Sequence, residues 1–131
     1  MTGETDLQKL LKTLEPTIND TEFVFCTLAT QEVASMKLQP ICLFKEDEGL
    51  TIVCSKEEAQ ASGFEYSFPC KMITLTVHSS LEAVGLTAAI AKKLAGAGIS
   101  ANVIAAYYHD HVFVPIDRAE EAIALLKEFS R

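Results

Sequence analysis

The chain has 131 residues, 49% of them hydrophobic and 22% charged, and its formal net charge at pH 7 is −7. This composition predicts a compact protein with a sizeable core and excludes a disordered chain. The acidic balance excludes nucleic acid as an expected partner, because the lysines and arginines are few and scattered. No apolar run approaches the length of a membrane span, and the N-terminus does not resemble a signal peptide. We therefore expect a cytoplasmic protein without a membrane partner.

The first half of the chain predicts a helix, three strands and a second helix. Leucines recur at helical spacing before Pro16, which predicts a helix over residues 5–14. Segments rich in β-forming residues predict strands at 22–29, 41–45 and 50–54, the last two joined as a hairpin by the acidic turn 46–49. Ser55 and Glu58 match a capping box for a short helix that ends at Gly63.

The four cysteines of the chain lie in or beside these β-rich segments and form no CxxC pair. No histidine stands at zinc-ligand spacing from any of them. We expect reduced, buried, small hydrophobic side chains at Cys26, Cys42, Cys54 and Cys70, with no redox or metal role.

The second half predicts strand, helix, hairpin and helix. Ile73, Leu75 and Val77 alternate with polar residues, as in a half-buried strand over 72–78. An apolar stripe from Leu86 to Ala97 predicts a helix, which the glycines at 96 and 98 end. We predict a hairpin formed by residues 102–108 and 111–115, with its turn at His109-Asp110. Tyr107 and Tyr108 would then face opposite sides of a strand, one in the core and one free to line a site. A capping box from Asp117 to Glu120 opens the last helix, whose predicted core face is Ala119, Ala122, Ile123, Leu126 and Phe129.

The order of these elements indicates a fold made of two related units. Strand, helix, strand, strand, helix over residues 71–129 is the order of a ferredoxin-like unit that lacks its last strand. The stretch 50–59 also resembles 112–122 in pattern, as the second strand of a hairpin followed by a capped helix. We predict an α+β protein of two ferredoxin-like βαββαβ units, with antiparallel sheets and helices on one face, at residues 1–69 and 70–131.

The loop between the strand and the helix of the second unit has the chemistry of a binding site. Free N–H groups and the positive dipole end of a helix favour a carboxylate, and Gly85 lets the backbone approach a ligand closely. A carboxylate in the hairpin turn suits an ammonium or guanidinium group. A free amino acid carries both kinds of charge. The helix entry at Gly85 and the turn carboxylate of Asp110 are therefore candidate ligand contacts.

Residues 84–100 resemble the signature of the ACT domain family, in which a glycine follows the first strand and an apolar helix ends in an Ala-Gly-Ile-Ser exit. Residues 106–115 are similar to a stretch in a subset of tandem ACT proteins that includes small bacterial proteins and cytosolic arginine sensors. The chain as a whole resembles a tandem ACT-like bacterial protein, similar to the ACT units of those sensors and of aspartate kinases. The resemblance implies a regulatory module that binds a free amino acid at an interface between ACT units. Carried over residue by residue, it implies ligand contacts at Ser79, Ser80, Leu81, Glu82, Ala83, Val84, Gly85, Leu86 and Asp110. The acidic surface and Asp110 add a slight preference for a basic amino acid. The resemblance further implies a homodimer or other homo-oligomer, an unidentified protein partner, and neither a cofactor nor catalytic residues.

Each predicted site residue also has a structural interpretation. Ser79 and Glu82 match a capping box, Gly85 permits close packing between helix and sheet, and aspartate is common in turns such as that predicted at Asp110. His109 and His111 share one face of a strand, but two histidines are too few for a zinc site, so we expect no metal. A ligand-free interaction or assembly domain is the alternative function. A small enzyme is disfavoured because no P-loop, GxGxxG or nucleophile–base pattern is present.

Overall fold

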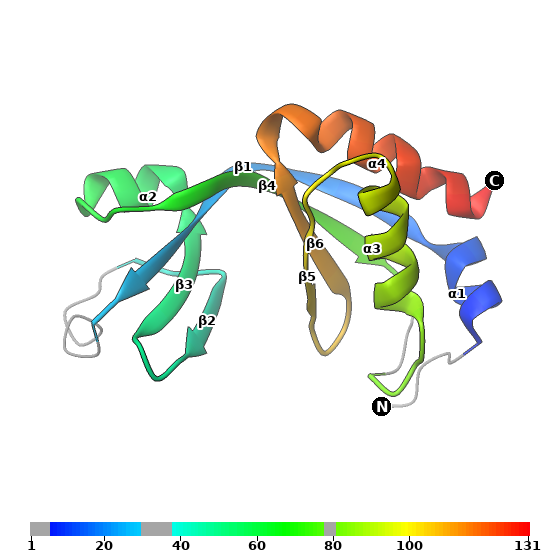
Figure 1. The fold of residues 1–131 in the computed structure, drawn as a ribbon, viewed down its shortest axis with the longest axis horizontal. Coiled ribbons are helices and arrows are strands. Elements are labelled where there is room, and N and C mark those ends of the chain that lie inside the picture. Colours follow the sequence, from blue (N-terminus) through cyan, green and yellow to red (C-terminus); the bar gives the residue numbers. More distant parts are fainter. Residues whose placement is uncertain (1–5, 30–37, 78–80) are drawn as a thin grey trace. The chain divides into compact units, whose positions relative to one another are not determined.

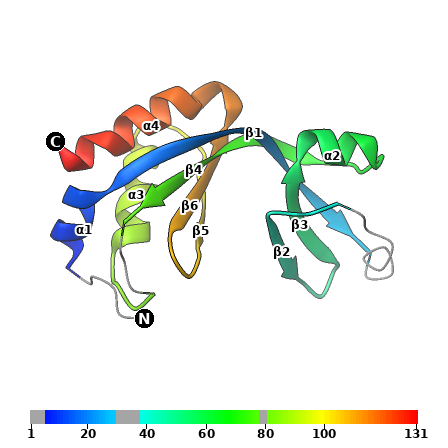
Figure 2. The same cartoon turned by 180° about the vertical axis from the view of Figure 1, so that it is seen from behind.

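A computed structural model describes residues 6–29, 38–77 and 81–131, and these divide into two compact units. The terminal unit comprises the described residues of 1–20 and 71–131, and the central unit comprises those of 21–70. Figures 1 and 2 show the chain from opposite sides. The hydrogen-bonded strand order is β2-β3-β1-β4-β6-β5. The predicted α+β fold with antiparallel sheets is confirmed.

The helices and strands agree in type with the prediction for most of the chain. The elements of the terminal unit include α1 (Leu7–Thr13), α3 (Leu86–Gly96), β5 (Asn102–Ala105), β6 (Asp110–Pro115), α4 (Ala119–Lys127) and the 3-10 turns η2 (Ile116–Arg118) and η3 (Glu128–Ser130). The central unit contains β2 (Cys42–Lys45), β3 (Leu50–Ser55) and α2 (Lys56–Ala61). Two longer strands, β1 (Glu15–Leu28) and β4 (Ser67–Thr76), contribute residues to both units.

The two shared strands complete both four-stranded units. In the terminal unit the order is β1-β4-β6-β5, so residues 15–20 supply the last strand that the sequence over 71–129 lacks. In the central unit the order is β2-β3-β1-β4, and residues 67–70 supply the last strand. Each unit therefore has the strand order of a ferredoxin-like fold. The division of the sequence at 69/70 stays a prediction, which expression of residues 70–131 alone would test.

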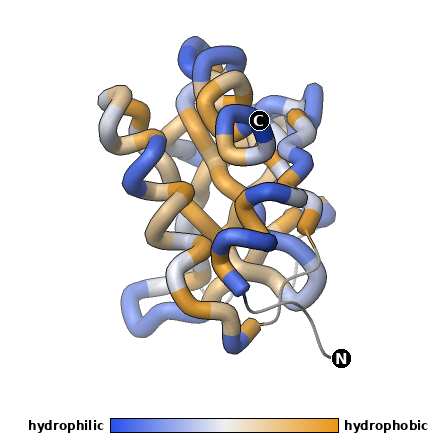
Figure 3. The backbone as a smooth tube through the Cα atoms, turned by 90° about the vertical axis from the view of Figure 1, so that its right-hand side faces the viewer, coloured by the Kyte–Doolittle hydropathy of each residue, from blue (hydrophilic) through white to orange (hydrophobic). Residues whose placement is uncertain are grey.

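The core of the terminal unit is built from one face of each helix and of β4 and β6. Ile73, Leu75 and Val77 are buried against Ile90 and Leu94 of α3, which confirms the predicted alternation. The predicted core face of the last helix is also confirmed, with three of its residues buried and two packed at the edge of the core. Figure 3 shows hydrophobic and hydrophilic positions alternating along the helical turns, as expected for helices that bury one face.

The N-terminal helix packs into this same core through Leu10 and Leu14. The Asp6 carboxylate accepts hydrogen bonds from the amides of Gln8 and Lys9 and so caps the start of α1. The helix ends at Thr13, close to the predicted position, and Leu14 is already extended. Pro16 then falls at the beginning of β1, where a missing N–H is tolerated, so the strand starts seven residues before the predicted 22.

In the central unit, side chains of β1, β3 and α2 form a second core. Cys26, Cys54 and Cys70 are buried and free, as predicted, whereas Cys42 is only half-buried because β2 is an edge strand. Burial raises the pKa of the Cys54 and Cys70 thiols to about 12. Such thiols stay protonated at neutral pH and are poor nucleophiles.

The capping motif of α2 is formed as predicted. The Ser55 hydroxyl oxygen accepts from the Glu58 amide at 3.0 Å. At the other end, the Gly63 amide donates to the Gln60 carbonyl and the Phe64 amide to the Ala59 carbonyl, with Gly63 in the left-handed region. These two bonds form a Schellman motif, which ends the helix.

The internal repeat is present in the strand register. Leu43 pairs with Ile52 in one hairpin and Val103 with Val112 in the other, so both partners shift by 60 residues between the units. The burial pattern along β3 is identical to that along β6. Leu50 and Asp110 are therefore equivalent positions, each the first residue of its strand and each buried.

Three local predictions about the second hairpin and the last helix are wrong. The hairpin turn is formed by residues 106–109, where the Ala106 amide donates to the His109 carbonyl, and Asp110 already belongs to β6. Both Tyr107 and Tyr108 lie in that turn, with exposed fractions of 54% and 65%, and neither is in the core. No capping box starts the last helix, because residues 116–118 form a 3-10 turn and Arg118, the N-cap of α4, makes no side-chain cap.

Candidate functional site

The candidate site begins with the loop that connects β4 to α3. Ser79 and Ser80 lie outside the described residues, as does His78. Of the remaining predicted residues, Leu81, Glu82 and Val84 are exposed, whereas Ala83 packs against the terminal core and Leu86 is buried within it. Within the described part of the loop, the exposed residues are therefore Leu81, Glu82 and Val84.

Gly85 is the N-cap residue of α3 and has a positive φ of 97°. A Cβ at this position would lie 3.2 Å from Leu7 Cδ2 of α1, so the glycine makes room for the N-terminal helix. Gly85 therefore permits close packing, as in its structural interpretation, but it packs against helix α1 and not against a sheet. Because α3 begins at Leu86, Glu82 does not stand in its first turn, and Gly85 offers no side chain to cap the helix.

Asp110 is the second contact zone. It is the first residue of β6, pairs with Ala105 and has an exposed fraction of only 6%. Side chains alternate along a strand, so Asp110 lies on the same face as Val112 and Val114, which pack in the core with α3. The carboxylate is therefore on the helix-covered face of the sheet, at the end of the strand.

The structure brings the two zones to the same end of the terminal unit. β4 lies next to β6 in the sheet, and Thr74 Oγ1, near the end of β4, is 3.1 Å from Nδ1 of His111, near the start of β6. The described loop residues before α3, 81–85, lie at the same end of the unit as the turn between β5 and β6, as both ribbon views show (Figures 1 and 2).

The electrostatics of this end are governed by burial. Burial raises the pKa of the Asp110 carboxyl, and the neighbouring His111 and His109 oppose that rise. Burial also lowers the pKa of His111. Nδ1 of His109 is buried without a hydrogen-bond partner in the part of the chain that the structure describes. Sequence reasoning considered His109 only as a metal ligand or acid–base group and missed this free polar atom.

Metal ligands do not gather at this site. Within residues 6–29, 38–77 and 81–131, no group of three or more histidine, cysteine, aspartate or glutamate side chains could hold an ion. The Nδ1 atom of His111 is already engaged with Thr74.

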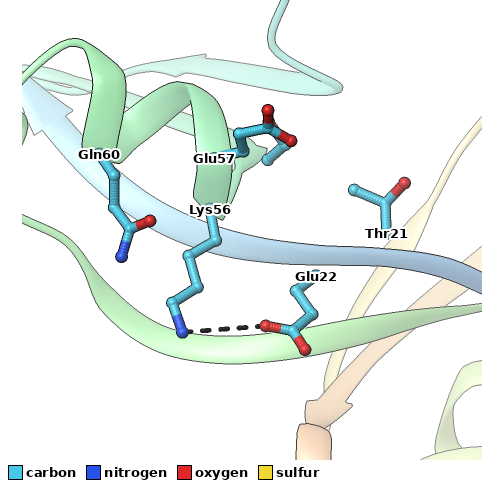
Figure 4. A pocket seen from close by; sticks show the side chains of 6 residues that line it. Thr21, Glu22, Lys56, Glu57 and Gln60 are labelled. Carbon is cyan, nitrogen blue, oxygen red and sulfur yellow. Dashed lines mark ion pairs between the residues drawn. The ribbon is translucent and has the colours of Figure 1, made fainter.

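Sequence reasoning did not identify two hollows that described residues of the central unit line, because their walls come from segments far apart in the chain. One, of about 420 Å³, is lined by Thr21, Glu22, Ser55, Lys56, Glu57 and Gln60. Figure 4 shows the Lys56 ammonium directed at the Glu22 carboxylate, at 3.8 Å. The lysine and one of the two glutamates of that hollow are therefore already paired with each other. The other, of about 460 Å³, is lined by Phe25, Thr27, Phe64, Glu65, Tyr66 and Ser67.

Protein-family models match nearly the whole chain. One ACT-domain family model matches residues 2–71 and another matches residues 67–128. The chain belongs to the ACT-domain family. It is a tandem ACT protein of regulatory, small-ligand-binding type. No helix within the described residues is long and apolar enough to cross a bilayer.

Solved structures resemble this tandem ACT protein over most of its length. A protein of unknown function from Vibrio cholerae is 50% identical, with a TM-score of 0.85 over 95% of this chain and 96% of that one. A protein from Agrobacterium tumefaciens is 16% identical, with a TM-score of 0.69 and 89% of each chain covered. The ligand-free regulatory subunit of aspartate kinase from Thermus thermophilus is 11% identical, with a TM-score of 0.69 over 90% of this chain and 97% of that one. No curated protein sequence matches the chain.

Proposed function

We propose that this tandem ACT protein is a regulatory module that senses a free amino acid. In this proposal the loop from Ser79 to Leu86 binds the ligand's carboxylate, and Asp110 binds its ammonium or guanidinium group. The site lies at an interface between ACT units. The observation that carries the proposal is the buried carboxylate of Asp110 at the position that a leucine, Leu50, occupies in the central unit.

The comparison with Leu50 supports a functional role, because the fold itself accepts an apolar side chain at this point. Burying a carboxylate costs free energy unless a partner compensates it. A cationic ligand group provides such a partner through a charge-assisted hydrogen bond. The 11-residue α3 directs its positive dipole end toward the same end of the unit, where it favours an anion. Together the two zones match the two charges of an amino acid.

The raised pKa of Asp110 gives the proposed binding a defined pH dependence. A cationic ligand binds the ionised carboxylate, so it lowers the pKa of Asp110 and releases a proton on binding. Affinity for a basic amino acid is therefore expected to rise as pH increases through the titration of Asp110, and to fall in acid.

A ligand-free assembly domain is the second candidate, and one observation favours it. Leu81, Val84, Tyr107 and Tyr108 are all exposed by more than half, and all belong to the loop and hairpin turn of the same unit. Exposed apolar side chains of this kind mark protein contacts. We propose a cytoplasmic homo-oligomer in either case, with regulation through altered contacts with itself or with an unidentified protein partner.

A thermal-shift screen against the twenty amino acids tests the proposal, with Asp110→Asn as the variant and Asp47→Asn as the control. Asp47 lies exposed in the hairpin turn of the central unit, so its substitution changes charge equally without touching the site. A ligand at about 100 times its Kd adds about 2.7 kcal/mol to stability. We expect that shift in the wild type and in Asp47→Asn, and its loss in Asp110→Asn. A flat response to all twenty amino acids, with an oligomer in light scattering, would favour the assembly domain.

A further inference from the structure

The second hollow of the central unit has the chemistry of a cation site, and we name it the aromatic pocket. It has a volume of about 460 Å³ and is lined by Phe25, Thr27, Phe64, Glu65, Tyr66 and Ser67. Three of these residues are half-buried aromatics, one is an exposed glutamate, and none is basic. We propose that the aromatic pocket binds a small organic ammonium ion, at a site separate from the amino-acid site proposed above.

The pocket exists because α2 is short. The Schellman motif at Gly63 reverses the chain after the helix, and the Phe64 amide bonds back to the Ala59 carbonyl at 2.9 Å. Phe64 and Tyr66 consequently return and pack against the edge of the central core. In the terminal unit the equivalent helix α4 continues to Lys127, so the chain makes no such reversal there.

Contacts outside the pocket hold its rings in place. The Tyr66 hydroxyl accepts a hydrogen bond from Nε2 of Gln60 at 3.3 Å. Phe25 packs edge-to-face against Phe68, with ring centroids 5.9 Å apart and planes at 67°. Rings fixed in this way need not be ordered when a ligand binds, which lowers the entropic cost of binding.

Phe68 itself has an unusual backbone. Its φ of 56° makes it the one residue other than glycine with a positive φ among those the structure describes. A bulky side chain in the left-handed region is strained, and such strain persists only where the surrounding structure imposes it. Strained residues cluster at ligand sites, and here the strained residue supports a ring of the pocket.

The lining groups favour a cation over a neutral or anionic ligand. Each aromatic ring presents a negative face, which attracts an ammonium ion within about 6 Å of its centre. The Glu65 carboxylate adds a full negative charge at the rim, and the net charge of −7 attracts cations to the surface as a whole. A methylated ammonium fits best, because its methyl groups are weakly hydrated and can contact the rings. The volume lies within the range of small-molecule pockets.

Titration with choline, followed by NMR chemical shifts of the full chain, tests the proposal. The neutral isostere 3,3-dimethylbutan-1-ol has the same shape without the charge. We expect it to bind at least about 5-fold more weakly than choline. Glu65→Gln should weaken choline binding about 3- to 10-fold. Glu57→Gln, which removes the same charge from α2 outside this pocket, should leave it unchanged.

Two ring variants separate the aromatic contribution from the fold. Tyr66→Phe keeps the ring and should bind choline within about 2-fold of wild type, whereas Tyr66→Leu should lose about 10-fold. Glu65 is exposed, so its variant remains informative even where Tyr66→Leu does not fold. Equal affinity for choline and its isostere would overturn the proposal, as would unchanged binding by Glu65→Gln or the absence of choline binding by the wild type.

Discussion

Replacing Asp110 with leucine should stabilise the ligand-free protein. The equivalent residue of the central unit is Leu50, which is 5% exposed, and Asp110 is 6% exposed. The two positions share their strand register and burial pattern, so the backbone around Asp110 is suited to a buried leucine. The substitution thus exchanges a desolvated carboxylate for an apolar side chain that this fold already accommodates.

The expected gain is about 1–3 kcal/mol at neutral pH, the range for the desolvation cost of a buried polar group. For a chain of this size that corresponds to a rise in Tm of about 4 °C per kcal/mol. Because the pKa of Asp110 is raised in the folded state, its charged form is the destabilising one. The advantage of Asp110→Leu should therefore be smallest in acid and grow as pH rises through that pKa.

Thermal unfolding of Asp110→Leu and wild type across pH 4 to about pH 8 measures both effects. Asp47→Leu is the matched control, because it removes the same charge from an exposed turn and should leave a pH-independent difference. The variant should also lose any amino-acid response, so that greater stability comes with lost binding. If Asp110→Leu unfolds at a lower temperature than wild type at pH 7, Asp110 has a structural role and the argument from Leu50 is refuted.

Three further substitutions test other parts of the structure. The reciprocal change Leu50→Asp should destabilise by more than about 3 kcal/mol, measured by urea unfolding, because it loses a buried side chain and buries a charge; near-neutrality would contradict the equivalence of the two positions. Gly85→Ala should lower the free energy of unfolding by about 1–2 kcal/mol, because of the positive φ and the 3.2 Å approach to Leu7. Gly96→Ala, where a Cβ meets open space, should raise it by up to about 1 kcal/mol. The reverse order would exclude the packing role of Gly85. Ser55→Ala should cost about 1 kcal/mol by removing the cap of α2, and an unchanged Tm would show the cap to be dispensable.

Local patterns predicted most of the elements, since they depend on neighbours in the sequence. Two features could be predicted because each is decided within one strand or one helical turn. They are the alternation of Ile73, Leu75 and Val77 and the Ser55–Glu58 cap. The turn of the second hairpin was predicted at the wrong position, because pairing between strands decides it and local propensity does not. Tyr107 has a high strand propensity and Asp110 favours turns, yet pairing of Ala105 with Asp110 fixed the register instead.

The candidate site was predictable in outline but not in its chemistry. A glycine before an apolar helix and an aspartate in the next hairpin could be located from the sequence alone. Burial of Asp110 could not, because it depends on α3 covering that face of the sheet. The aromatic pocket was invisible for a similar reason, since Phe25 and Phe64 are brought together only by the fold.

The strands β1 and β4 have a consequence for how the chain is synthesised. The terminal unit draws on residues 15–20 and on residues up to the end of α4, so its contacts span almost the whole chain. As the polypeptide leaves the ribosome, α1 and residues 15–20 cannot complete their packing in the terminal unit until the last helix has emerged. The central unit needs only residues 21–70 and can assemble earlier.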